Sequence, residues 1–160
     1  MTVQVGDKAP DGRFHVINAD GPGSVSTDEL FSGRKVVVFS VPGAFTPTCS
    51  KEHLPGFVEN ANAIKAKGVD TIACMAVNDM FVMDAWGESA GAGDKVLMLA
   101  DGNGTYTAAL GLELDGSGFG LGTRGQRFAM VVEDGTVTQL HVEAPMEFKV
   151  SSAENILANL

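Results

Sequence analysis

The sequence predicts an α/β fold in which helices cover both faces of a mixed central sheet. Two observations predict this class. Short apolar segments that suit buried strands alternate with helical segments in the first part of the chain, as in parallel β-α-β units. Two further strand segments then flank Asp134-Gly135, a dipeptide typical of tight antiparallel hairpins. With 160 residues, 44% of them hydrophobic, the chain suits one domain over residues 1–160.

Local patterns place the elements of the front part of the chain. Proline and glycine interrupt residues 1–34, which we expect to form an extended arm or hairpin around 14–17. A helical turn over 26–31 follows, because Ser26 and Glu29 have the spacing of a capping box. The apolar, β-branched run 35–40 predicts a buried strand.

A helix is expected next, from Pro47 to about Lys67. Thr46 suits the position before a helix, and proline suits the first turn. Apolar residues recur at helical spacing, at Leu54, Phe57, Val58 and Ala61. Pro55 lies beyond the first turn and lacks an N–H, so we expect it to kink the helix there.

The rest of the chain continues the alternation. Residues 69–77 are apolar on both faces, as in a strand covered on both sides, and residues 111–126 are glycine-rich without a period, which favours a flexible loop. The remaining expected elements are a helix from 79 to about 90, a strand over 96–100, a helix over 105–110, strands over 127–133 and 136–142, and a final helix that begins near 152.

Composition narrows the classes of function. The net charge of −9 and the pI near 4.6 argue against nucleic-acid or anionic-membrane partners, which require a basic surface. No apolar leader and no run of about 20 apolar residues is present, so we expect a cytoplasmic protein with no membrane association. Two cysteines, Cys49 and Cys74, are too few for a disulfide framework, which leaves catalytic or sensory sulfur chemistry.

Cys49 is the leading site candidate. It falls in the first turn of the helix after strand 35–40, at the carboxyl end of a strand, where α/β proteins place ligands. The unpaired N–H groups of a helix start favour a thiolate. Thr46, one turn earlier, has two readings: its hydroxyl donates to the sulfur or to a bound oxygen, or it only caps the helix. An inert cysteine in a tight turn is the alternative for Cys49.

Two arginines border the glycine-rich loop, Arg124 and Arg127. Arg127 opens an apolar strand, where a guanidinium needs an anionic partner; a thiolate is one option and a surface salt bridge is the other. Gly120 to Gly125 matches the G-x-G-x-x-G string of dinucleotide loops, but a strand follows it instead of a helix. We therefore reject a dinucleotide site.

The second cysteine and the histidines leave alternatives open. Cys74 lies in an apolar strand, where it is either an inert buried residue or a disulfide partner of Cys49. His53 follows Cys49 by four residues and is either part of a Cys–His pair or a helix-surface residue. The sequence has no metal-ligand spacing, so we expect no metal and no other cofactor.

Pro42, Thr46 and Cys49 form P-x-x-x-T-x-x-C, which resembles the active-site signature of the peroxiredoxins. The wider string VPGAFTPTCSKEHLPGF is similar to the type-II branch, which includes the mammalian peroxiredoxin five form, and the likeness extends to RFAMVVEDG. The resemblance implies a thioredoxin-like fold, a homodimer, and reduction of hydrogen peroxide and alkyl hydroperoxides without metal or flavin. By position, Cys49 is the peroxidatic cysteine and Thr46 binds the peroxide.

The same resemblance assigns the surrounding residues. Pro42 shields the site, Arg127 holds the thiolate, and Phe45 and Phe119 are dimer contacts or pocket residues. The mammalian form has a resolving cysteine near its C-terminus, but 148–152 contains none here. Cys74 matches a resolving position proposed in some relatives.

Burial of Cys74 would oppose a resolving role, so we expect glutathione with glutaredoxin, or thioredoxin, to reduce the sulfenic acid. Without a reductant, excess peroxide would convert Cys49 to sulfinic acid. Two alternatives remain, a redox-sensing or chaperone-like protein that signals through Cys49 and a hydrolase built on Cys49 and His53.

Overall fold

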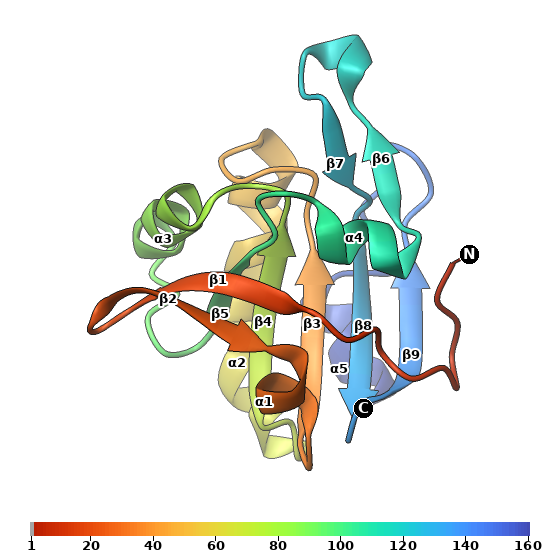
Figure 1. Cartoon of the computed structure of the whole chain (residues 1–160). Helices are drawn as coiled ribbons and strands as arrows, with labels where there is room; N and C mark the ends of the chain where they lie inside the picture. The colour runs from red at the N-terminus through yellow and green to blue at the C-terminus, as the bar shows by residue number, and fades with distance from the viewer. Residues whose placement is uncertain (1) are drawn as a thin grey trace.

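The computed structural model describes residues 2–160, which form a seven-stranded sheet flanked by helices (Figure 1). The strands of this sheet are β1 (Arg13–Asn18), β2 (Gly21–Ser26), β3 (Lys35–Ser40), β4 (Thr71–Ala76), β5 (Leu97–Ala100), β8 (Phe128–Glu133) and β9 (Thr136–Val142). The α-helices are α1 (Thr27–Phe31), α2 (Leu54–Ala66), α3 (Met80–Ser89), α4 (Thr105–Leu110) and α5 (Ala153–Asn159). This confirms the predicted mixed sheet with helices on both faces.

The strands lie in the order β2-β1-β5-β4-β3-β8-β9. β3, β4 and β5 are mutually parallel, whereas β8 is antiparallel to β3, and β9 to β8. The carboxyl ends of β3 and β4 therefore meet at one edge, the upper edge in Figure 1, beside the start of β8. The predicted hairpin turn is confirmed, with Asp134 and Gly135 both at positive φ.

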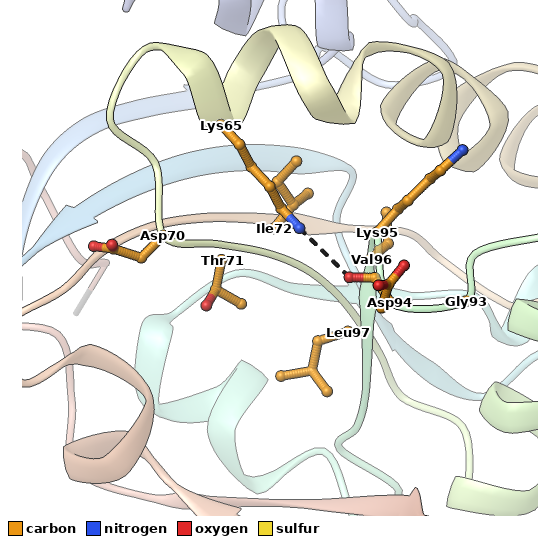
Figure 2. Close-up of a pocket in the computed structure, with 9 residues that line it drawn as sticks. All are labelled: Lys65, Asp70, Thr71, Ile72, Gly93, Asp94, Lys95, Val96 and Leu97. Atoms are coloured by element: carbon orange, nitrogen blue, oxygen red, sulfur yellow. Dashed lines mark hydrogen bonds between the residues drawn. The ribbon is translucent and has the colours of Figure 1, made fainter.

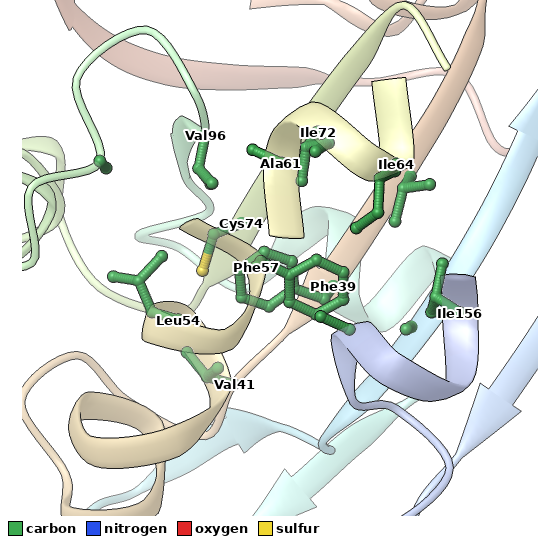
Figure 3. Close-up of a cluster of buried hydrophobic side chains, with 14 of the residues drawn as sticks. Phe39, Val41, Leu54, Phe57, Ala61, Ile64, Ile72, Cys74, Val96 and Ile156 are labelled. Carbon is green, nitrogen blue, oxygen red and sulfur yellow. The ribbon is translucent and has the colours of Figure 1, made fainter. Parts of the chain in front are cut away.

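Alternating side chains of the central strands build two cores. Val37 and Phe39 of β3 face a cluster with α2, α3 and α5, while Val36 and Val38 face a second cluster with α1 and α4. Figure 3 shows the first cluster, in which Phe39 stacks on Phe57 with ring centroids 4.1 Å apart. Both faces of β3 and β4 are covered, which is why these strands are apolar throughout.

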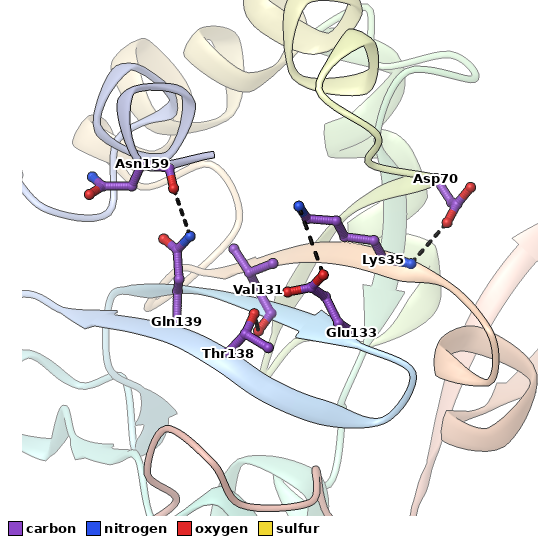
Figure 4. Close-up of polar contacts among 7 residues, drawn as sticks. All are labelled: Lys35, Asp70, Val131, Glu133, Thr138, Gln139 and Asn159. Atoms are coloured by element: carbon purple, nitrogen blue, oxygen red, sulfur yellow. Dashed lines mark hydrogen bonds and ion pairs between the residues drawn. The ribbon is translucent and has the colours of Figure 1, made fainter.

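Polar contacts close the sheet edge opposite to the carboxyl ends (Figure 4). The Lys35 backbone N–H donates to Asp70 Oδ2 at 2.9 Å, and Lys35 Nζ lies 4.0 Å from Glu133 Oε1. Gln139 on β9 donates to the carbonyl oxygen of Asn159 at 3.0 Å, which ties α5 to the sheet. These contacts lie at the surface, away from the carboxyl ends of the parallel strands.

Two expectations about irregular segments are corrected. Residues 111–126 contain a small antiparallel hairpin, β6 (Glu113–Asp115) and β7 (Thr123–Gly125), with the short 3-10 helix η2 (Ser117–Phe119) between them. The hairpin projects beyond the upper edge of the sheet (Figure 1). Its strands are too short for alternation to be visible in the sequence.

The helix around Pro55 also differs from the expectation. It begins at Pro47, but its irregularity is a π-turn, η1 (Cys49–His53), which precedes α2 instead of following the first turn. Leu54 N–H bonds to the carbonyl of Cys49, five residues back, and Pro55 then occupies the first turn of α2. The wider turn therefore places Pro55 at a position where the missing backbone N–H of proline costs the helix no hydrogen bond.

Within residues 2–160, no helix has both the length and the apolar character needed to cross a membrane.

Candidate active site

Cys49 lies at the carboxyl end of β3, within the first turn of the helix that begins at Pro47. Its side chain is fully buried. Thr46 precedes this turn, and its carbonyl accepts from Ser50 N–H at 2.9 Å. The Thr46 hydroxyl does not donate to the sulfur; its Oγ1 donates to the carbonyl oxygen of Gly43 at 2.8 Å. The hydroxyl hydrogen is therefore engaged, and the lone pairs of Oγ1 remain as acceptors.

Arg127 is the charged neighbour of the sulfur. It stands immediately before β8, half-buried, and its Nη2 donates to Cys49 Sγ at 3.0 Å. The described residues place no carboxylate within ion-pair distance of this guanidinium, so the surface salt bridge considered above is wrong. The guanidinium supplies the positive charge that a buried thiolate needs.

His53 is the second partner of Arg127. It is fully buried, so the helix-surface interpretation is wrong. Arg127 Nη1 lies 2.7 Å from His53 Nδ1, and His53 Nε2 lies 3.0 Å from the carbonyl oxygen of Ser151. Because a guanidinium only donates, Nδ1 accepts and the ring proton sits on Nε2. Burial, with the charge of Arg127, lowers the pKa of His53 to about 3, so the ring is neutral.

The direct pairing of Cys49 with His53, one of the two alternatives for this histidine, is not formed. Both side chains contact Arg127 instead, through different nitrogens of its guanidinium. With its Nδ1 occupied by a cation and its Nε2 by a carbonyl, His53 has no free nitrogen to take a proton from a nucleophile. The geometry therefore does not support a Cys–His hydrolase.

Glu143 is a site residue that the sequence reasoning missed. It follows β9, is 7% exposed, and its Oε2 accepts from Lys149 N–H (2.7 Å), Ser151 N–H (2.8 Å) and Ser151 Oγ (2.7 Å). Burial opposes ionisation of the carboxyl, but these hydrogen bonds outweigh it and lower the pKa of Glu143. In the sequence, Glu143 is an acidic residue directly after a strand of mixed polar and apolar residues, and this position alone does not identify a buried partner.

A second missed residue, Asn78, holds the loop before the helix. Asn78 follows β4, and its Oδ1 accepts from the backbone N–H of Ala44 at 2.9 Å. Gly43 leaves room for its neighbours, since a Cβ there would lie 3.2 Å from Thr46 Cγ2 and 3.3 Å from Arg124 Nη1. Arg124 donates to the carbonyls of Val77 (3.1 Å) and Leu121 (2.9 Å), and so ties β7 to the end of β4.

The aromatic and proline candidates occupy the surroundings of this loop. Pro42 is half-buried between β3 and Gly43. Phe45 has a φ of 65°, is 54% exposed and lies 6.5 Å from the Trp86 ring, measured between centroids. Trp86 Nε1 in turn donates to Ser50 Oγ at 3.0 Å. Phe119, at the tip of the β6–β7 hairpin, is 81% exposed and so is not a core residue.

Cys74 lies on β4, in register with Phe39 of β3, and is fully buried in the first core cluster (Figure 3). Burial, with the charge of nearby Cys49, raises the pKa of its thiol well above the usual value. Both cysteines are free thiols. Cys74 is therefore a poor nucleophile in this conformation.

A pocket elsewhere on the molecule is unrelated to this site (Figure 2). It lies at the amino ends of β4 and β5, with Lys65 Nζ donating to the Asp94 carbonyl at 3.4 Å. The parallel strands separate it from the carboxyl edge where Cys49 lies. In the part of the chain that the structure describes, no cluster of His, Cys, Asp or Glu has metal-binding geometry.

Fold and site together define a thioredoxin-like protein with a buried cysteine held by an arginine. The Redoxin family profile matches residues 4–157. The chain is 50% identical to Peroxiredoxin-2B of Arabidopsis thaliana, covering 99% of this chain and 98% of that protein. It is 53% identical to the chloroplastic Peroxiredoxin-2E-2 of Oryza sativa subsp. japonica, covering 99% and 73%.

A solved structure agrees with these relatives. The crystal structure of reduced Prx3 of Vibrio vulnificus in complex with H₂O₂ has a TM-score of 0.95 and 52% identity, covering 99% of each chain. The chain belongs to the peroxiredoxins, in their type-II branch, and is a thiol-dependent peroxidase.

Proposed function

We propose that Cys49 is the peroxidatic cysteine, that Arg127 and Thr46 act with it, and that Pro42 shields it from water. The observation that carries this proposal is the 3.0 Å contact between Arg127 Nη2 and Cys49 Sγ. A desolvated sulfur in contact with a permanent cation has the environment of a reactive thiolate. The chemistry needs no metal or organic cofactor.

The reaction follows from these contacts. The Cys49 thiolate attacks one peroxide oxygen, an S–O bond forms as the O–O bond breaks, and the leaving oxygen departs as hydroxide or alkoxide and takes up a proton. Thr46 Oγ1, which donates its own hydrogen to the Gly43 carbonyl, accepts a hydrogen bond from the O–H of the peroxide. The remaining N–H groups of Arg127 donate to the peroxide oxygens as charge develops on them. Hydrogen peroxide and alkyl hydroperoxides are the proposed substrates.

An external thiol is the proposed reductant of the Cys49 sulfenic acid, either glutathione with glutaredoxin or thioredoxin. Burial of Cys74 and the raised pKa of its thiol support this choice over an internal disulfide. Cys74 resolves Cys49 only if β4 and the Cys49 turn separate locally.

A homodimer is the proposed assembly, with Phe45 and Phe119 at the contact between copies. Their exposure supports this, because large aromatic side chains that are exposed to solvent are typical of protein–protein interaction surfaces. Light scattering of the wild type and of Phe119→Ser tests the dimer; a wild-type monomer at micromolar concentration contradicts it.

The proposed location is the cytoplasm, supported by two free cysteines in a chain without disulfides.

The test of the catalytic assignment compares Cys49→Ser with Cys74→Ser. We expect Cys49→Ser to lose peroxide consumption and Cys74→Ser to keep it with glutathione and glutaredoxin or with thioredoxin. A Cys49→Ser protein with full activity contradicts the assignment. Intact mass after one equivalent of peroxide separates the routes: a Cys49–Cys74 disulfide contradicts the external thiol. A sulfenic acid that no thiol turns over favours the redox-sensing alternative.

A further inference from the structure

We propose that Glu143 is a positioning residue for the reaction of Cys49 with peroxide, because its buried carboxylate closes a ring of hydrogen bonds that fixes the Arg127 guanidinium. This inference rests on the proposed function of Cys49 and Arg127. Glu143 acts on Arg127 by two routes, one through the main chain and one through its side chain.

The ring has four members. Glu143 N–H donates to the carbonyl oxygen of Arg127 at 3.0 Å. Glu143 Oε2 accepts from Ser151 N–H and Ser151 Oγ, at 2.8 and 2.7 Å. The Ser151 carbonyl accepts from His53 Nε2 at 3.0 Å, and His53 Nδ1 accepts from Arg127 Nη1 at 2.7 Å. The path thus begins at the backbone of Arg127 and returns to its guanidinium.

The contacts define the donor and acceptor roles around this ring. Arg127 always donates, so His53 accepts at Nδ1 and carries its proton on Nε2. That proton requires an acceptor, which is the Ser151 carbonyl, and an ionised Glu143 accepts from both donors of Ser151. A ring in which every partner has a fixed role holds its members in one geometry.

The neutral histidine explains why the ring suits catalysis. A carboxylate in contact with Arg127 would fix the guanidinium but would also compensate its charge. His53 fixes it without a charge, so the positive charge remains available to the Cys49 sulfur. The negative charge of Glu143 is placed further along the ring, where N–H and O–H groups bind it.

The same carboxylate also holds the segment that covers the guanidinium. Glu143 Oε2 accepts from Lys149 N–H at 2.7 Å. The neighbouring Phe148 ring lies 5.8 Å from Arg127 Cζ and 5.0 Å from the His53 ring, measured to ring centroids. Loss of the Glu143 carboxylate would therefore free Ser151, whose carbonyl accepts from His53, and also the segment that carries Phe148.

Three substitutions separate the position of the carboxylate from its charge. Glu143→Ala removes the acceptor, and Glu143→Asp keeps the charge but shortens the side chain by one methylene. Glu143→Gln removes the charge but keeps an oxygen able to accept from Lys149 and Ser151. Glu147→Gln is the matched control, since Glu147 lies in the same segment, is exposed, and pairs only with Lys149 at the surface, 3.6 Å away.

The measured quantity is the second-order rate constant for oxidation of Cys49 by hydrogen peroxide, from acid quench and mass spectrometry. We expect Glu143→Ala to lower it by about 10- to 100-fold, as for a displaced catalytic group, and Glu143→Asp to lower it by at least about tenfold. Glu143→Gln and Glu147→Gln should retain most of the wild-type value. A loss in Glu143→Gln with none in Glu143→Asp overturns the proposal, because charge and not position would then matter.

A double-mutant cycle separates positioning from a general structural role. In an Arg127→Ala background, Glu143→Ala or Glu143→Asp should cause no further loss of the rate constant, because the group that they position is absent. An equal further loss overturns the proposal. The proposed function has its own test. It is contradicted if Cys49→Ser remains active, and this result does not depend on the Glu143 variants.

Discussion

The backbone N–H of Ala44 donates to Asn78 Oδ1 at 2.9 Å, and this bond sets the direction in which Thr46 presents its hydroxyl. Ala44 N–H and Gly43 C=O belong to one planar peptide group. Asn78 holds the group from one side, and Thr46 Oγ1 donates to it from the other at 2.8 Å. Asn78, on the loop after β4, thus orients a side chain beside Cys49.

Replacing Asn78 with alanine should therefore slow peroxide reduction without removing any group that touches the peroxide. We expect the rate constant for Cys49 oxidation to fall by about tenfold, since a freed peptide group no longer fixes the Thr46 hydroxyl. Stopped-flow oxidation at several peroxide concentrations measures this. In a Thr46→Val background the same change should have no effect, and an undiminished effect there contradicts the coupling.

Thr46 itself should tolerate serine but not valine. Valine keeps the shape but removes the acceptor oxygen, so we expect the rate constant to fall on the order of 100-fold, as when one polar contact to a transition state is lost. Serine keeps the hydroxyl and its bond to Gly43. Equal rates for the valine and serine variants in the same assay would show that the hydroxyl is not used.

His53 should make the protein less stable in mild acid. Its pKa is about 3 in the folded state, against 6.5 for an ordinary histidine, chiefly because of burial and then the charge of Arg127. Between these values the unfolded chain binds a proton that the folded protein does not. Stability therefore falls with decreasing pH, by up to about 1.4 kcal/mol per pH unit.

Urea unfolding at pH 7 and pH 5 measures this contribution in a comparison with His53→Asn. The wild type should lose about 2 kcal/mol more than the variant between these two pH values. Glu143, whose pKa is also lowered, adds an acid dependence to both proteins and cancels in the difference. Parallel losses in the two proteins would show that His53 is not buried in its neutral form.

Cys74 should act in the opposite pH range. Burial, with nearby Cys49, raises the pKa of its thiol above the usual 9.0, so above that pH the unfolded chain releases a proton that the folded protein keeps. Stability should fall with increasing pH there, by up to about 1.4 kcal/mol per unit. Cys74→Ala removes this contribution and should flatten the alkaline side of a urea-unfolding series; identical slopes contradict the assignment.

Much of the fold could be predicted because its determinants are local. The runs at β3 and β4 are apolar on both faces, and the structure covers both faces with helices. The hairpin turn at Asp134-Gly135 and the helix start at Pro47 also follow from a few neighbouring residues. The three-residue strands of the β6–β7 hairpin carry no such signal, because alternation needs a longer segment.

The polar network of the site could not be predicted because its partners are distant in sequence. Arg127 and His53 are 74 residues apart, and His53 and Ser151 are 98 apart. Local pattern alone left a thiolate or a surface ion pair open for Arg127 and a Cys–His pair or an exposed helix face open for His53, and it did not single out Glu143. The fold brings all of them to one buried ring, where their properties depend on one another.

The bond from Trp86 to Ser50 gives the protein a built-in optical reporter. Trp86 is the only tryptophan in the sequence, and its indole donates to the residue that follows Cys49. Indole emission responds to the polarity and hydrogen bonding of its surroundings, so a change at the sulfur that shifts this turn should alter the fluorescence. We expect oxidation and reduction of Cys49 to change this emission, so that both can be followed in real time without a label; a Ser50→Ala protein would show how much of the change this one bond transmits.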